Sequence, residues 1–281
     1  MDTPGITGAP DQAAPDEAAM GLGAMAARLA PLGGRYHLDG AQGWLQGRTM
    51  YGGASSFLAY AAARRQFPDL GPLRAGQIGF IAPVGEQLEI EATMLRSGRN
   101  ISHVETSLYC AGALAHRTIW LFGPARDANG AVEPAAEPAL LPPEDAPPLD
   151  AQEFVPDFIL RMDVRRALPK DPVGAAPRGA VIRRWVRLKE RGGLDPLGEL
   201  IAIGDTLPPG SMRAMERRGP ISSINWALTP LGNAPQTRDG WWLLETSSNF
   251  MDCGFSSETL RMWNTDGREV MRGLQSVAVF G

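Results

Sequence analysis

Residues 51–67 read YGGASSFLAYAAARRQF, and this stretch decides the fold class. Tyr51, Gly52 and Gly53 open a helical run that has almost no polar face before Arg64. A helix that is apolar on nearly all sides must be enclosed by other parts of the chain. The sequence therefore predicts a central, buried helix rather than a surface helix.

Strand-like segments follow this helix. Between residues 88 and 94 apolar side chains alternate with Glu89, Glu91 and Thr93, which is the period of a half-buried strand. Turn-forming residues divide the segment into strands at Leu73–Ile81, Gln87–Leu95, Ile101–Ala111 and Leu114–Phe122.

The second half of the chain repeats this order. LDPL at residues 194–197 opens an apolar helix, GELIAIGD, at residues 198–205. Four strand candidates follow it, at Ile221–Thr229, Trp241–Phe250, Ser256–Trp263 and Glu269–Phe280. The pattern predicts an α+β chain with two antiparallel sheets, each wrapped around a central helix, which is a double hot dog.

Two segments of low complexity set the expected domain boundaries. Residues 1–22 are rich in Pro, Gly, Ala and Asp, so we expect a disordered or loosely docked N-terminus. Residues 124–150 carry repeated prolines and predict an extended linker. The two domains are then expected at residues 23–123 and 151–281.

Composition excludes several classes of protein. The formal net charge of −4 gives no general attraction for nucleic acid. No apolar run is long enough to cross a bilayer, and the start lacks the basic and apolar regions of a signal peptide, so a cytoplasmic location is expected. Cys110 and Cys253 are too few for a disulfide framework and are predicted to be buried free thiols.

Metal and nucleotide motifs are missing from the sequence. It has no C-x-x-C or H-x-x-x-H spacing, so no metal site is predicted. The G-x-G-x-x-A match that starts at Gly21 has no strand before it, which argues against a dinucleotide site. The three histidines are scattered over predicted strands and are expected to be structural: His37, His103 and His116.

Short motifs in both halves indicate a particular protein family. WLQGRTMYGG at residues 44–53, before an alanine-rich helix, resembles the opening of the thioesterase-like double hot-dog family, which includes bacterial acyl-coenzyme A thioesterase II. The resemblance covers about residues 35–281 apart from the linker. It continues through Phe80–Pro83, Leu95–Arg99, Ile221–Trp226, Trp242–Leu244 and Asp266–Gln275.

The resemblance implies hydrolysis of an acyl-CoA thioester to a free acid and coenzyme A, without a metal or organic cofactor, in a protein that forms a homo-oligomer. In that family an aspartate, a serine or threonine, and a glutamine position and activate water. Gln275 matches the glutamine and Ser248 is our choice for the hydroxyl. Ser222, with Ser223 beside it, stands where the family has its aspartate, and a serine cannot act as a general base near neutral pH.

This departure leaves three readings open. Another carboxylate serves as base, with Asp205 and Asp252 the nearest by sequence, although the first equally suits a structural cap and the second a turn. Water is only oriented and hydrolysis is slow. The protein is a non-catalytic acyl-CoA or lipid-binding protein. A hot-dog dehydratase ranks last, because no histidine lies in an H-x-x-x-G-x-x-x-x-P context.

Tyr51, Gly52 and Gly53 are the predicted substrate-binding residues. Glycines before a helix let a ligand approach the free backbone N–H groups, where the positive end of the helix favours a developing oxyanion. A packing requirement between helix and sheet explains the same glycines equally well.

Overall fold

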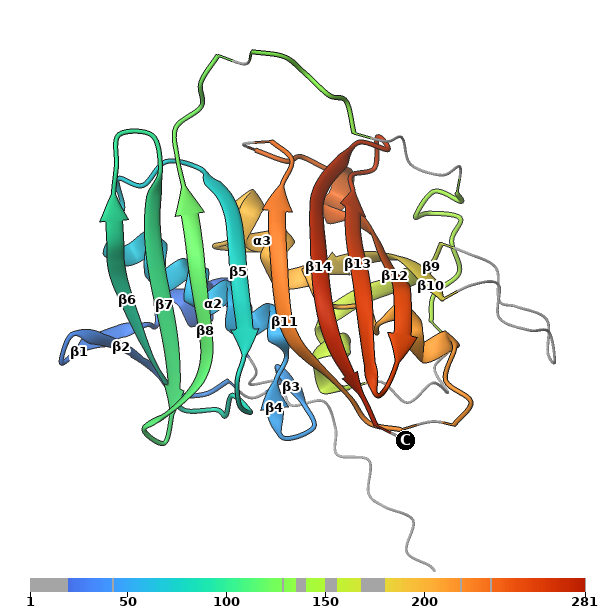
Figure 1. Cartoon of the computed structure of the whole chain (residues 1–281), viewed down its shortest axis with the longest axis horizontal. Helices are drawn as coiled ribbons and strands as arrows, with labels where there is room; N and C mark the ends of the chain where they lie inside the picture. The colour runs from blue at the N-terminus through green and yellow to red at the C-terminus, as the bar shows by residue number, and fades with distance from the viewer. Residues whose placement is uncertain are drawn as a thin grey trace, which may run out of the picture.

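One antiparallel sheet covers the helices in a computed structural model of the chain (Figure 1). The structure describes residues 20–41, 43–127, 129–134, 140–149, 156–167, 180–217, 219–232 and 234–280. The elements of the first half are α1 (Leu22–Ala27), β1 (Ala30–Leu32), β2 (Arg35–Leu38), β3 (Leu45–Gln46), β4 (Thr49–Met50), α2 (Gly52–Gln66), β5 (Leu73–Phe80), β6 (Leu88–Ser97), β7 (Ser102–Cys110) and β8 (Ala113–Phe122).

The second half repeats the arrangement of strands around a helix. Its elements are the 3-10 helix η1 (Asp157–Arg161), β9 (Met162–Arg166), β10 (Val181–Leu188), α3 (Pro196–Gly204), η2 (Gly210–Arg213), β11 (Ile221–Pro230), η3 (Arg238–Gly240), β12 (Trp242–Asp252), β13 (Phe255–Trp263) and β14 (Glu269–Val279).

The two expected sheets are joined into one. The described residues form a 12-stranded sheet in the order β1-β2-β6-β7-β8-β5-β11-β14-β13-β12-β10-β9, beside a small β3–β4 hairpin. The joint is the antiparallel pair β5–β11, in which Ile78 lies opposite Trp226. Each half alone would leave this strand with an unpaired edge, and pairing the two edges satisfies their backbone groups. The two antiparallel sheets expected side by side are therefore one continuous sheet.

Both predicted central helices are buried and pack against each other. Every residue of α3 from Leu197 to Gly204 is buried, and so is most of α2 between Gly53 and Ala63. The small side chains allow close approach: a Cβ on Gly53 would collide with the backbone oxygen of Ala202. The absence of a polar face in the sequence thus reflects enclosure on all sides.

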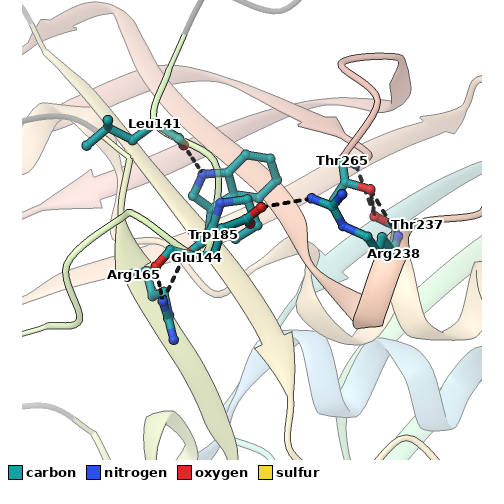
Figure 2. Close-up of polar contacts among 8 residues, drawn as sticks. Leu141, Glu144, Arg165, Trp185, Thr237, Arg238 and Thr265 are labelled. Carbon is teal, nitrogen blue, oxygen red and sulfur yellow. Dashed lines mark hydrogen bonds and ion pairs between the residues drawn. The ribbon is translucent and has the colours of Figure 1, made fainter.

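A strap from residue 140 to residue 149 docks on β9 and β10 of the second half (Figure 2). The Trp185 indole donates a hydrogen bond to Leu141 O at 2.9 Å, and Arg165 donates to Pro143 O at 2.8 Å. The strap covers a second apolar cluster that includes Trp185, Leu243 and Trp263. This part of the predicted linker is a packed element of the second half, while residues 128, 135–139 and 150 lie outside the described residues.

Two further expectations concern the N-terminal segment and the two cysteine thiols. Residues 1–19 lie outside the described residues, but Leu22 of α1 is fully buried. The prediction of two buried thiols was wrong: Cys110 is partly buried, and Cys253 is exposed in the turn between β12 and β13. A turn tip packs against little, so burial could not be inferred from residue type there. No helix among the described residues is long and apolar enough to span a membrane.

Candidate active site

Helix α2 begins with free backbone donors. Tyr51 is its N-cap and makes no side-chain capping hydrogen bond. Ala54 N and Ser55 N both donate to Tyr51 O, whereas no described residue accepts a hydrogen bond from the N–H of Gly52 or Gly53. These two N–H groups lie at the positive end of the helix and remain available to an anionic or partly charged oxygen.

Gly52 and Gly53 are glycine for two different structural reasons. A Cβ on Gly53 would collide with the backbone of α3, which is the packing requirement. A Cβ on Gly52 would instead collide with Oδ2 of Asp205 and lie 3.1 Å from the Phe80 ring. The first position of α2 is therefore glycine because a carboxylate lies directly against it.

Asp205 is the C-cap of α3, and its carboxylate meets Gln275 of β14. Gln275 Nε2 donates a hydrogen bond to Asp205 Oδ1 at 2.6 Å. Burial raises the pKa of Asp205 to about 7, although the hydrogen bond from Gln275 opposes this change. The side chain keeps some accessible surface, and no described residue donates a hydrogen bond to Oδ2. A carboxylate that titrates near neutrality and has a free oxygen suits general-base chemistry.

Tyr51 fixes the junction between the two helices. Its fully buried ring stacks on Phe158 with centroids 4.0 Å apart and planes 4° from parallel. Thr206 donates its hydroxyl hydrogen to Ile203 O at 2.6 Å, so at 3.0 Å the Tyr51 hydroxyl is the donor to Thr206 Oγ1. Burial, aided by the charge of Asp205, raises the pKa of Tyr51 well above its usual range. Tyr51 thus stays a neutral phenol that holds the site in place.

Gln275 has a second carboxylate beside it. Glu258 of β13 lies directly opposite Gln275 in the sheet and is fully buried. It accepts hydrogen bonds from Gly210 N at 2.8 Å, from Ser211 N at 3.3 Å and from the Ser256 hydroxyl. These contacts occupy Glu258 in anchoring the loop that follows Asp205, so of the two carboxylates Asp205 has the free oxygen.

Ser248 belongs to this anchoring network. Its Oγ lies 2.9 Å from Ser256 Oγ, and Ser256 in turn bonds Glu258. Ser248 is opposite Glu258, which is opposite Gln275, so the three side chains lie in one row across β12, β13 and β14 on the same face of the sheet. The structure therefore brings Ser248 to the edge of the site, two strands away from Gln275.

Ser222 lies on the other face of the sheet. It pairs with Ala278, three residues from Gln275 on β14, and side chains an odd number of residues apart point to opposite faces. A bulge between Ser223 and Asn225 shifts the register, so Ser223 shares the face of Gln275. Ser222 is exposed and is not brought together with Gln275, contrary to the sequence-based expectation.

The other candidate carboxylate, Asp252, serves a turn. It is exposed in the turn between β12 and β13, where its Oδ1 accepts the N–H of Cys253 at 2.7 Å. Of the carboxylates weighed from the sequence, Asp205 is the one that the fold brings to Gln275. The signal for it was present: a charged residue ends an otherwise apolar, buried helix and must find a polar partner.

Two family models together match most of the chain. The acyl-CoA thioesterase N-terminal domain matches residues 41–123, and the acyl-CoA thioesterase C-terminal domain matches residues 139–279. The chain belongs to the acyl-CoA thioesterase family. The C-terminal match begins at residue 139, so it includes the strap that packs on the second half. The resemblance read from the sequence is thereby confirmed.

Solved structures share the hot-dog fold of this acyl-CoA thioesterase family member. A hot-dog protein of unknown function from Alicyclobacillus acidocaldarius is 20% identical with a TM-score of 0.80, covering 93% of this chain and 99% of its own. The tesB protein of Mycobacterium avium subs paratuberculosis is 17% identical with a TM-score of 0.73, over 93% of this chain and all of its own (100%). Acyl-CoA thioesterase II TesB2 of Mycobacterium marinum is 18% identical with a TM-score of 0.69, over 88% and 93%. No match was found among curated protein sequences.

The N-terminus of the second buried helix, α3, is capped. Asp195 is the N-cap of α3, and its side chain accepts the N–H groups of Leu197 and Gly198, each at 3.0 Å. Pro196, the first helical residue, has no N–H to offer. Among the described residues, α3 therefore binds its first donors itself, whereas the N–H groups of Gly52 and Gly53 at the start of α2, next to Asp205, stay free for an anionic oxygen.

Proposed function

We propose that the chain hydrolyses an acyl-CoA thioester to a carboxylic acid and coenzyme A at the start of α2. Asp205 is the general base, Gln275 orients it, and the Gly52 and Gly53 N–H groups receive the carbonyl oxygen. The observation that carries the proposal is the Gln275–Asp205 hydrogen bond of 2.6 Å beside the uncapped start of α2. The family of the chain supports the same chemistry.

The reaction balances with the groups in this site. Water attacks the thioester carbonyl carbon while Asp205 Oδ2 takes a proton from it. The carbonyl oxygen becomes an oxyanion facing the two N–H groups, which a preorganised site stabilises strongly. The tetrahedral intermediate then collapses with cleavage of the C–S bond, and the thiolate leaves with the proton that Asp205 held. The base is thereby restored.

The alternative is a non-catalytic protein that binds acyl-CoA or another lipid. The resemblance read from the sequence, which puts Ser222 where the family has its aspartate, is what favours it. Asp205 argues against it, because a buried carboxylate is costly to retain without a use. In this reading the site would keep its shape and its free N–H groups but would not turn the ligand over.

A panel of acyl-CoA thioesters with a thiol-reactive dye separates the two functions. Hydrolysis releases free coenzyme A thiol, so the proposal predicts enzyme-dependent dye signal for at least one member of the panel. Thermal stabilisation by the same thioesters without any thiol release would establish the binding protein and overturn the proposed activity.

The proposal also includes the domain organisation, the cellular location and the oligomeric state. We treat residues 23–123 and 151–281 as the two halves of a double hot dog that share one sheet, in a cytoplasmic homo-oligomer. The exposed edge strand β1 leaves backbone groups unpaired, which supports association. Light scattering should give a mass above 30.1 kDa, and a concentration-independent monomer mass would remove the oligomer.

A further inference from the structure

A polar patch lies between α2 and the sheet in the first half. His116 and Thr118 are two residues apart on β8, so their side chains share the face that meets the helix. Ser56 of α2 completes the patch, with its Oγ 3.4 Å from His116 Nε2. All three residues are fully buried, in a layer where apolar packing is the norm.

Two atoms of this patch have no partner. His116 Nδ1 and Thr118 Oγ1 make no hydrogen bond with any described residue. Burial lowers the pKa of His116 to about 3, so its ring is neutral at physiological pH and carries one donor and one acceptor nitrogen. Buried polar atoms without partners are rare and costly in folded proteins. Two of them on one strand face point to a ligand group that completes the patch.

The patch adjoins the proposed reaction centre through one side chain. Phe80 of β5 lies opposite His116 in the sheet, with ring centroids 5.6 Å apart and an interplanar angle of 64°. The other edge of the Phe80 ring approaches Gly52, against which the Asp205 carboxylate lies. Phe80 is only partly buried. The Phe80 ring therefore lies between the proposed thioester carbonyl site and the patch, in contact with both.

Large aromatic residues limit the space beyond Thr118. Trp120, the next residue on the same face of β8, is fully buried, and its Nε1 donates to Thr106 Oγ1 at 2.9 Å. Tyr60 of α2 packs edge-on against Trp120 with centroids 5.8 Å apart. Because these rings occupy the face of β8 beyond Thr118, we expect only a short group to reach the patch.

We propose that the patch of Ser56, His116 and Thr118 recognises the acyl group, and that the substrates are short acyl thioesters bearing a neutral hydroxyl or keto oxygen. This inference rests on the proposed function. None of the three side chains of the patch carries a charge. A second carboxylate on the acyl chain would therefore be buried there without a cation to pair with. An unsubstituted alkyl chain would leave both atoms unpaired.

The test compares 3-hydroxybutyryl-CoA with butyryl-CoA, which differ only in the oxygen. The wild type should prefer the hydroxylated thioester by about tenfold or more in kcat/KM, since a buried site built for hydrogen bonding rejects an analogue without the group. Thr118→Val keeps the shape of the side chain and should reduce this preference severalfold. Thr93→Val, at an exposed position of β6, is the matched control and should keep the wild-type ratio.

Binding of the corresponding non-hydrolysable thioethers, measured by calorimetry, keeps this inference separate from the activity. If no thioester is hydrolysed but the hydroxylated thioether binds more tightly and loses this advantage in Thr118→Val, the proposed activity fails and the patch assignment stands. Equal rates and equal binding for both ligands in the wild type overturn the assignment. An unchanged preference in both Thr118→Val and Ser56→Ala also overturns it, and then the patch holds internal water only.

Discussion

At the scale of single residues, the site depends on two carboxylates with different surroundings. Glu258 is fully buried and accepts three hydrogen bonds, so its role is to hold the loop after Asp205. Asp205 accepts one hydrogen bond, from Gln275, and burial raises its pKa to about 7. Environment, rather than residue type, thus assigns anchoring to one acid and proton transfer to the other.

The raised pKa of Asp205 predicts the pH dependence of hydrolysis. The base is active when ionised, so kcat/KM should rise with pH through a midpoint near 7 and level off above it. The Gln275 hydrogen bond lowers the pKa of Asp205, so Gln275→Leu should move the midpoint upward as well as slow the reaction. A midpoint near 4, or no change in Gln275→Leu, would show that another group titrates.

The same shift predicts a stability effect. Burial raises the pKa of Asp205 from an ordinary 3.8 to about 7 in the folded state, so ionisation destabilises the fold as the pH rises from about 4 to 7. Asp205→Asn removes this cost and can still accept the Gln275 hydrogen bond. Allowing for partial exposure, we expect a gain of about 1–3 kcal/mol at pH 8 and little gain at pH 4 in denaturant unfolding. Equal or lower stability of the variant at pH 8 would contradict this.

At the scale of elements, the starts of α2 and α3 differ although the two helices occupy matching places. α3 is capped by Asp195, whereas α2 has no side-chain cap. Gly53→Ala pushes a Cβ into the α3 backbone, which cannot yield, and should lower the stability by about 2–4 kcal/mol. Gly52→Ala meets the movable ends of Asp205 and Phe80 and should retain more stability while losing most activity.

Chemical denaturation and thiol-release assays on this matched pair measure both effects. The account requires the larger loss of stability in Gly53→Ala, and the larger loss of activity relative to folded protein in Gly52→Ala. The reverse order would mean that the Asp205 carboxylate does not lie against α2 during the reaction.

The helices and strands were largely predictable from the sequence, whereas the position of the site residues was not. The two buried helices follow from their lack of a polar face, and the strands from their turns and alternation. The β11 bulge has no comparable signature, and it moved Ser222 to the face opposite Gln275. Asp205 was identifiable only as one candidate, because its partner Gln275 lies 70 residues away in the chain and the contact depends on how α3 packs on β14 within the second half.

At the scale of the whole molecule, joining the halves through β5 and β11 aligns α2 with α3 and brings Asp205 of one half to Gly52 of the other. Neither half alone contains the site. Because Asp195 closes the start of α3, the chain should bind one acyl-CoA, not two. Calorimetric titration with a non-hydrolysable acyl-CoA thioether should give one ligand per chain, and a stoichiometry of two would show that the start of α3 is also open.

The most direct test of the account is the hydrolysis rate of Asp205→Asn beside that of Ser222→Asp, each compared with the wild type at pH 8. If Asp205 is the base, Asp205→Asn should lose about 10²–10⁴-fold in kcat/KM while remaining folded. Ser222→Asp places its carboxylate on the far face of the sheet and should stay within about twofold of the wild type. An active Asp205→Asn variant, or a Ser222→Asp variant accelerated tenfold or more, would contradict the assignment of Asp205.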